Sequence, residues 1–214
     1  MNNSDNRKLK SPIQHEYDGM AKEYDKRWQK YISKSASETL KRINLAGANE
    51  ILDVGCGTGE LLYVIHQQNP DIQLKGIDIS PEMLKVAESK LGSAAELQVG
   101  AASALPFDTN SIDMVMTISS FHYWPEPESC LTELRRVLKP GGRLIITDWC
   151  DDYLICKICD IFLRIFNNAH YKTYSLSDCK SLLRNSGFLD IQSEKYKIDF
   201  IWGLMTISAC KSYE

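Results

Sequence analysis

Short apolar runs alternate along this chain with stretches in which apolar side chains recur every three or four residues. The apolar runs predict strands, near 51–54, 73–78, 95–99, 112–118 and 143–149. The longer spacing predicts helices, near 58–67, 81–90 and 127–138. After Gly187, two more strands are expected near 188–197 and 199–210. This alternation is typical of an α/β fold in which a parallel sheet carries helices on both faces.

The third predicted helix has a clear inner face and a clear stop signal. Leu131, Leu134 and Leu138 lie on one side of it, and the run Lys139-Pro140-Gly141-Gly142 follows. Proline and glycine both disfavour a helix interior, so we expect the helix to end at this run. No internal repeat or low-complexity linker divides the chain, which predicts a single domain over residues 1–214.

Composition and charge narrow the class of protein. Of the 214 residues, 43% are hydrophobic and 25% are charged, as in a globular domain with a sizeable core. The 25 basic and 28 acidic residues give a net charge of -3, which provides no overall positive field for nucleic acid. The first ten residues are polar and predict no signal peptide, and no apolar stretch approaches the roughly 20 residues of a membrane span. We therefore expect a cytoplasmic protein without integral membrane contact.

The seven cysteines are an odd number scattered through predicted core elements, which favours reduced thiols over a disulfide framework. Cys156 and Cys159 have C-x-x-C spacing, but no second pair and no adjacent histidine completes a metal site. Cys159 falls within an apolar helical stripe and Cys156 at its edge. We interpret both as small packing residues and expect no metal.

The segment from Ile51 to Glu60, ILDVGCGTGE, carries the strongest functional signal. It predicts a buried strand, a sharp turn and a helix, and its alternate glycines allow positive φ angles and close approach of a ligand to the backbone. In a dinucleotide site, G-x-G-x-x-G, a glycine would stand where this chain has Glu60. Because Asp53 and Glu60 disfavour a phosphate, a cationic or zwitterionic ligand fits better than a dinucleotide. A dinucleotide-dependent oxidoreductase is therefore disfavoured.

A second acid ends the next predicted strand, QLKGIDIS at 73–80, which places Asp78 at the carboxyl end. In doubly wound sheets an acid at this position accepts hydrogen bonds from ribose hydroxyls. Together with the glycine turn, Asp78 predicts a nucleoside ligand without a phosphate.

Four motifs in order carry a family resemblance, namely ILDVGCGTGE at 51–60, GIDISPEML at 76–84, ALPF at 104–107 and ELRRVLKPGGRLIITDW at 133–149. They resemble the class I S-adenosylmethionine-dependent methyltransferases, particularly the ubiquinone/menaquinone-biosynthesis-like small-molecule branch with its methyltransferase type 11 domain. YDGMAKEYD at 17–25 and WGLM at 202–205 extend the resemblance over nearly the whole chain.

The resemblance implies a Rossmann-like, doubly wound seven-stranded sheet of order 3-2-1-4-5-7-6 with an antiparallel last strand. It also implies four parts of the single domain. These are an N-terminal helical cover at 1–45, a cofactor-binding core at 46–150, a helical insertion or lid at 151–175, and a C-terminal helix with strands at 176–214.

The resemblance further implies which residues bind S-adenosylmethionine and its product S-adenosylhomocysteine. Asp53 would help to place the amino group, Asp78 would take the ribose hydroxyls, and Tyr24 would contact cofactor or substrate from the N-terminal cover. The other cofactor-binding residues implied are Gly55, Cys56, Gly57, Ile79, Met83, Ala101, Ala102 and Ser119.

One position departs from the family pattern. An acid usually accepts the adenine amino group where this chain has Ala101, so recognition would fall to backbone groups near Ala102 or to Ser103. The loss of one such hydrogen bond costs on the order of 1 kcal/mol. A catalytically inactive module that binds S-adenosylmethionine or S-adenosylhomocysteine is therefore a second hypothesis.

The catalytic candidate is His122, in the segment TISSFHYW at 117–124 after the fourth strand, where family members contact the reacting centre. Histidine can accept a proton near neutral pH, but a packing or loop role for His122 is equally open. Tyr17 is a weaker candidate than Tyr24 for closing the site.

The helical insertion carries an apolar stripe of Ile155, Ile158, Ile161, Phe162, Ile165 and Phe166, with Lys157, Asp160 and Arg164 opposite. Three roles are open for it: to close an apolar acceptor pocket, to pack on the sheet, or to pack on another subunit. The partners expected are a small-molecule methyl acceptor and no nucleic acid, with a homodimer left open.

Overall fold

The computed structural model describes residues 11–213 as a seven-stranded sheet flanked by helices. The strands are β1 (Glu50–Val54), β2 (Gln73–Asp78), β3 (Ala95–Val99), β4 (Ile112–Ile118), β5 (Leu138–Trp149), β6 (Phe188–Lys197) and β7 (Gly203–Lys211). The helices are α1 (Pro12–Leu40), α2 (Glu60–Gln68), α3 (Pro81–Leu91), α4 (Pro127–Val137), α5 (Leu154–Phe166) and α6 (Leu176–Asn185). The predicted polar start of the N-terminal cover, residues 1–10, lies outside the described residues.

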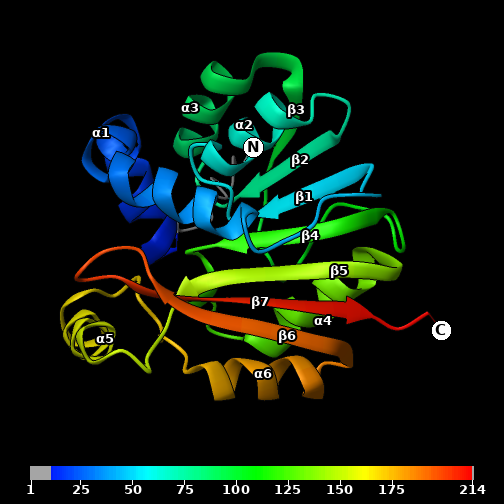
Figure 1. Ribbon diagram of the computed structural model, residues 1–214. Coiled ribbons are helices and arrows are strands. Elements are labelled where there is room, and N and C mark those ends of the chain that lie inside the picture. Colours follow the sequence, from blue (N-terminus) through cyan, green and yellow to red (C-terminus); the bar gives the residue numbers. More distant parts are fainter. Residues whose placement is uncertain (1–10, 214) are drawn as a thin grey trace, which may run out of the picture.

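The strand order is β3-β2-β1-β4-β5-β7-β6, as predicted. Neighbouring strands from β3 to β5 run parallel, whereas β7 runs antiparallel to both β5 and β6. Figure 1 shows α1 and α5 at the edge of the sheet toward which the arrows of β1, β2 and β5 point. Parallel strands bring their carboxyl ends to one edge, which is where ligands bind in such sheets.

The core has two layers because successive strand residues point to opposite faces of the sheet. On one face, Ile51 and Ile145 pack with apolar residues of α1, α2 and α3. On the other face, Leu52 and Leu144 pack with apolar residues of α4 and α6. Strands β1, β4 and β7 are therefore buried on both sides over most of their length, which explains their continuous apolar runs.

The boundaries differ most from the prediction around α2, between α4 and β5, and at the start of β7. Helix α2 begins at Glu60 rather than 58 because Gly59 adopts a left-handed conformation with φ 76°. Helix α4 ends at Val137, and the Pro140-Gly141 segment then belongs to an irregular start of β5, with Gly141 at φ 75°. Strand β7 begins at 203 because the Asp199 carboxylate accepts two backbone N–H bonds and closes a turn before it.

Helix α5 does not pack its apolar stripe on the sheet, and most of this stripe is exposed. Its buried residues are Cys156 and Asp160, so Cys156 packs as predicted, and Ile158 and Phe162 are 57% and 58% exposed. The Asp160 carboxylate accepts a hydrogen bond from the backbone N–H of Thr173 and pairs with a buried histidine. This polar anchor, rather than the apolar stripe, holds α5 on the domain.

Among residues 11–213, no helix is both long enough and apolar enough to cross a membrane. In the same part of the chain, no group of three or more His, Cys, Asp or Glu side chains is arranged to hold a metal ion.

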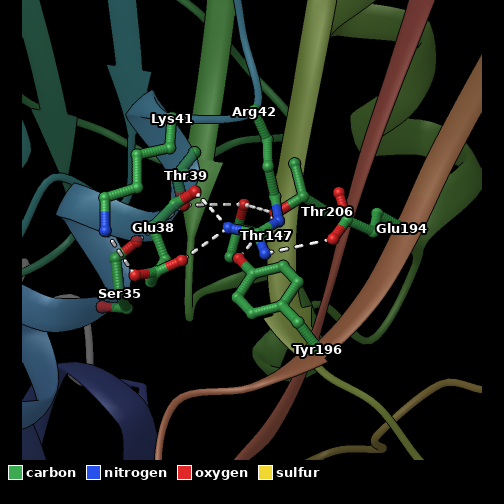
Figure 2. Close-up of polar contacts among 9 residues, drawn as sticks. All are labelled: Ser35, Glu38, Thr39, Lys41, Arg42, Thr147, Glu194, Tyr196 and Thr206. Carbon is green, nitrogen blue, oxygen red and sulfur yellow. Dashed lines mark hydrogen bonds and ion pairs between the residues drawn. The ribbon is translucent and has the colours of Figure 1, made fainter.

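A buried polar network attaches the end of α1 to the centre of the sheet (Figure 2). Thr39 of α1 donates to Thr147 Oγ1 of β5 over 2.9 Å, and Thr147 shares a 2.7 Å hydrogen bond with Thr206 of β7. Tyr196 of β6 hydrogen-bonds Thr206, and the guanidinium of Arg42 lies 3.5 Å from the centre of the Tyr196 ring. The network fixes the position of α1, which covers the carboxyl edge.

We expect Thr147→Val to lower the free energy of unfolding by about 1–3 kcal/mol. The substitution keeps the shape of the side chain but removes the buried hydroxyl at the centre of the network. The matched control is Thr132→Val, because the Thr132 hydroxyl makes its bond on the exposed face of α4. Urea unfolding of both variants measures the difference, and equal stabilities would contradict a stabilising role for the network.

Candidate functional site

Two adjoining cavities lie at the carboxyl ends of the strands. The first has a volume of about 340 Å³ and lies between the glycine turn after β1, the end of β2 and helix α1. The second, of about 570 Å³, lies between α1, α5 and the ends of β4 and β5. Tyr17, Tyr24, Ser119 and Tyr123 line both cavities and form a shared wall.

The glycine turn forms the floor of the first cavity. The backbone N–H groups of Gly55 and Cys56 donate to the carbonyl of Ile77, which ties the turn to β2. Gly55 has φ 77°, and a Cβ there would lie 2.1 Å from Ser120 Oγ, so a side chain cannot be accommodated. Gly57 has φ 53°, and a Cβ there would meet nothing within 4 Å. The turn therefore presents bare backbone to the cavity.

Asp78 stands at the end of β2 and holds the turn from the other side. Its Oδ2 accepts the N–H of Gly57 and its Oδ1 accepts the N–H of Ser80, both over 2.8 Å. Burial raises the pKa of Asp78, while these backbone bonds act in the opposite direction. Each carboxylate oxygen has capacity for a further hydrogen bond, so both can accept from a ligand in the cavity.

Asp53, at the end of β1, is buried with 3% of its surface exposed, and its Oδ1 has no hydrogen-bond partner among the described residues. Burial, followed by the negative charge of Asp78, raises the pKa of Asp53 to about 8. An unpartnered buried carboxyl oxygen is costly unless a ligand satisfies it. The position suits a cationic amino group.

In the folded protein Asp53 keeps its proton up to about pH 8, whereas in an unfolded chain the carboxyl group loses it near pH 4. The contribution of Asp53 to the free energy of unfolding therefore falls as the pH rises between these two values. We expect Asp53→Asn to gain stability relative to the parent protein by up to about 1.4 kcal/mol per pH unit between pH 5 and 8. Urea unfolding at both pH values measures this gain.

The control for the Asp53 experiment is Asp113→Asn. The Lys139 ammonium and two backbone N–H groups outweigh partial burial and lower the pKa of Asp113, so this carboxyl stays ionised throughout the window. The stability difference of the control should not change between pH 5 and 8. A flat difference for Asp53→Asn as well would contradict the raised pKa of Asp53.

The structure brings together all the residues that the sequence predicts for the cofactor. Each of them lines the first cavity: Tyr24, Asp53, Gly55, Cys56, Gly57, Asp78, Ile79, Met83, Ala101, Ala102 and Ser119. Ser103, the alternative partner for the adenine, lines it too. The segment 100–103 supplies no acidic side chain to the wall of this cavity. The acid that family members usually place near the adenine is therefore not replaced by a neighbouring residue of this segment.

The second cavity is enclosed mostly by aromatic and aliphatic side chains. The aromatic members are Tyr17, Tyr24, Trp28, Tyr31, His122, Tyr123, Trp149, Phe162 and Trp202. Helix α5 contributes Ile158, Phe162 and Leu163, so the exposed stripe of this helix continues into the cavity wall.

His122 is the buried polar group of this wall. Its Nδ1 lies 2.7 Å from Oδ1 of Asp148, and Asp148 also accepts the backbone N–H groups of His122 and Trp149. Because Nδ1 faces the Asp148 carboxyl group, we assign the imidazole proton to Nδ1, from which it is donated to Asp148 Oδ1. The other ring nitrogen, Nε2, is buried and has no partner among the described residues. The pair therefore presents a lone pair that can accept a proton.

Several residues of the second cavity wall, and Asp148 behind His122, were not predicted from the sequence. Asp148 and Trp149 end β5, and Trp202 precedes β7, which runs beside β5. The rule that ligands bind at the carboxyl ends of parallel strands applies to β5 as it does to β1, so it was a signal for Asp148. No local motif marks Tyr31 or Trp202, since their positions depend on the packing of α1 and of the β6–β7 turn.

Known proteins match this chain in sequence and in fold. The methyltransferase domain family matches residues 52–146. A ubiquinone/menaquinone biosynthesis C-methyltransferase of Geobacter is 33% identical over 131 residues, which is 58% of this chain and about half, 53%, of that relative. The enzyme of the same name from Desulfotalea psychrophila is 26% identical over 204 residues, 84% of this chain and 80% of that relative.

Solved structures share the fold over almost the full length. An S-adenosylmethionine-dependent methyltransferase of Thermotoga maritima superimposes with a TM-score of 0.77 and 18% identity, over 94% of this chain and 100% of that chain. None of these comparisons favours the inactive alternative. The glycine turn, the acids at the carboxyl ends of β1 and β2, and the strand order agree with these matches. Residues 52–146 match a methyltransferase domain, and these matches in sequence and fold support the resemblance to the class I S-adenosylmethionine-dependent methyltransferases of the ubiquinone/menaquinone-like branch.

Proposed function

We propose that this protein transfers a methyl group from S-adenosylmethionine to a small-molecule acceptor. The observation that carries the proposal is the pair of adjoining cavities with a shared wall. One cavity offers the carboxyls of Asp53, Glu60 and Asp78 together with bare backbone, which suit a zwitterionic nucleoside. The other is lined mostly by aromatic and aliphatic side chains and contains a proton acceptor. When bound, S-adenosylmethionine supplies an electrophilic methyl group on a sulfonium.

In this proposal, the residues of the first cavity bind and orient the cofactor. Asp78 accepts the ribose hydroxyls, and Asp53 Oδ1 receives the amino group. Ile79 and Met83 flank the adenine, whose amino group is left to backbone and to Ser103. The orphaned oxygen of Asp53 and the open space at Gly57 support the fit.

The residues of the second cavity exclude water and remove a proton. Methyl transfer depends largely on alignment of the nucleophile with the sulfonium, which a closed apolar cavity promotes. His122 accepts a proton at Nε2, and Asp148 positions its ring. The neighbouring tyrosines stay protonated near neutral pH and so cannot take the proton, because burial raises the pKa of Tyr24 to about 12 and also raises that of Tyr31.

Calorimetric titration of the purified protein with S-adenosylmethionine, S-adenosylhomocysteine and NAD tests this function. We expect the first two to bind and NAD not to bind, because Glu60 stands where a dinucleotide site has its last glycine. Binding of NAD alone would overturn the proposal. Binding of both sulfur nucleosides without methyl transfer to any acceptor would favour the inactive alternative.

We further propose that the protein acts in the cytoplasm on a freely diffusing acceptor. If the protein forms a homodimer, the exposed apolar stripe of α5 is the surface that we expect it to use. Analytical ultracentrifugation of the parent protein and of Ile165→Lys tests for such a dimer, and a monomer in both samples would exclude it.

A further inference from the structure

We infer that the acceptor is a planar aromatic alcohol of the phenol class, methylated on its hydroxyl oxygen after His122 Nε2 takes the hydroxyl proton. The inference rests on the proposed function and assigns a substrate class to the second cavity. Four features support it: the aromatic wall of the cavity, the hydrogen bonds that its polar atoms already make, the ring faces available to a cation, and the position of His122 beside the shared wall.

The wall of the cavity contains a rigid aromatic stack. The ring of Trp149 lies 4.7 Å from that of His122 with 12° between their planes, and 4.6 Å from that of Trp202 with 24° between planes. Tyr31 contacts Trp202 edge to face, and Tyr17 contacts Tyr123 in the same way. A flat ring that enters this space replaces water with offset-stacked and edge-to-face contacts, which a saturated ring makes less well.

The polar atoms of the wall select for a hydrogen-bond donor. The hydroxyl of Tyr17 donates to that of Tyr123 over 2.8 Å, and the hydroxyl of Tyr31 is bonded to Ser119 and to the Trp149 indole N–H. Among the described residues that line the cavity, His122 Nε2 is the buried side-chain atom left without a partner. It can accept only, since its Nδ1 proton faces Asp148. A ligand that fills the cavity must therefore bring an O–H or N–H to this atom.

The charges and ring faces disfavour a cationic amine or quaternary ammonium. A cation binds over an open ring face. The Trp149 ring is already stacked with the rings of His122 and Trp202, and the Arg27 guanidinium already lies 5.4 Å from the centre of the Trp28 ring. The carboxylate that lines the cavity, Glu16, accepts a hydrogen bond from Asn167. A positively charged acceptor would gain little here and would face Arg27.

The place of His122 completes the chemistry. Its ring lies 4.1 Å from that of Tyr123, which belongs to the wall shared with the first cavity, so a hydroxyl on Nε2 lies close to the junction. The hydroxyl proton moves to Nε2 and the oxygen forms a bond to the methyl carbon. The carbon–sulfur bond breaks and leaves its electron pair on sulfur. The products are an aryl methyl ether and S-adenosylhomocysteine, and the imidazolium paired with Asp148 returns its proton to water.

Calorimetry with three matched probes tests the inference on protein saturated with S-adenosylhomocysteine. The probes are 1-naphthol, its saturated counterpart decahydro-1-naphthol, and (1-naphthylmethyl)trimethylammonium. We expect 1-naphthol to bind at least about 10-fold more tightly than either of the others. Equal binding of the saturated alcohol would overturn the aromatic selection. Tighter binding of the ammonium would identify a cationic acceptor instead.

A pair of variants links the probe ranking to the cavity. Trp202→Leu should weaken 1-naphthol binding about 10-fold, whereas Phe200→Leu should not, because Phe200 is 84% exposed on the same turn and lies outside the cavity wall. Thermal melts check that both variants fold, and equal effects would place the naphthol elsewhere. S-adenosylhomocysteine is titrated before the three probes. If it does not bind, that result counts against the proposed function. The three probes are then compared on the protein without S-adenosylhomocysteine, and their order of affinity still decides the acceptor class.

Discussion

Replacement of Asp78 with alanine should weaken the binding of S-adenosylmethionine by about 100-fold or more while the protein stays folded. Asp78 offers two oxygens at the end of β2, and we assign one to each ribose hydroxyl. A hydrogen bond to a charged acceptor contributes about 1.5–3 kcal/mol, and each 1.4 kcal/mol is a factor of ten in affinity. Titration calorimetry measures the loss, and a thermal melt checks the fold.

The control for Asp78 must match its structural role, because Asp78 also accepts two backbone N–H bonds. Asp113 does the same for Asn49 and Glu50 and lies outside both cavities. Asp113→Ala should therefore reproduce any general loss of stability but keep cofactor affinity. If Asp78→Ala binds S-adenosylmethionine as tightly as the parent protein, the site assignment is wrong.

Replacement of His122 with asparagine should lower kcat by about 100- to 10,000-fold and leave cofactor affinity unchanged, which is the range expected when a general base is lost. Asparagine preserves a donor toward Asp148 but cannot take a proton at the Nε2 position. Methyl transfer from labelled S-adenosylmethionine to 1-naphthol provides the rate, and calorimetry provides the affinity.

The domain contains a natural control for His122. His170 is also buried and is also paired with an aspartate, Asp160, over 2.8 Å, and its ring centre lies 5.4 Å from that of His122. His170 lines neither cavity, so His170→Asn should affect stability but not kcat once the protein is folded. Equal losses of kcat in both variants would show that His122 is a packing residue.

Asp148→Asn should lower kcat without raising KM, as expected of a residue that positions a base.

Local motifs explain why the cofactor side was predictable from the sequence. The glycine turn follows β1 directly and Asp78 is the last residue of β2, and parallel register brings the ends of these two strands together, with Val54 beside Ile77. A short sequence therefore specifies both the conformation and the place of these groups. The residues predicted for the cofactor line one cavity for this reason.

The acceptor side depends on contacts between distant segments. Asp148 is 26 residues from His122, and Trp202 reaches the cavity only because β7 runs antiparallel beside β5. In α5, the periodicity predicts which residues share a face but not which face is buried. The burial of Asp160 follows from its contacts with His170 and Thr173, which a helical wheel does not contain.

The most direct test of the proposed function is a crystal structure of the protein with S-adenosylmethionine. We predict that the ribose hydroxyls lie on Asp78, that the amino group lies within hydrogen-bond distance of Asp53, and that the methyl group points through the shared wall at Ser119 and Tyr123 toward His122. A nucleoside bound outside the first cavity, or a methyl group directed away from the aromatic cavity, would contradict the proposed function.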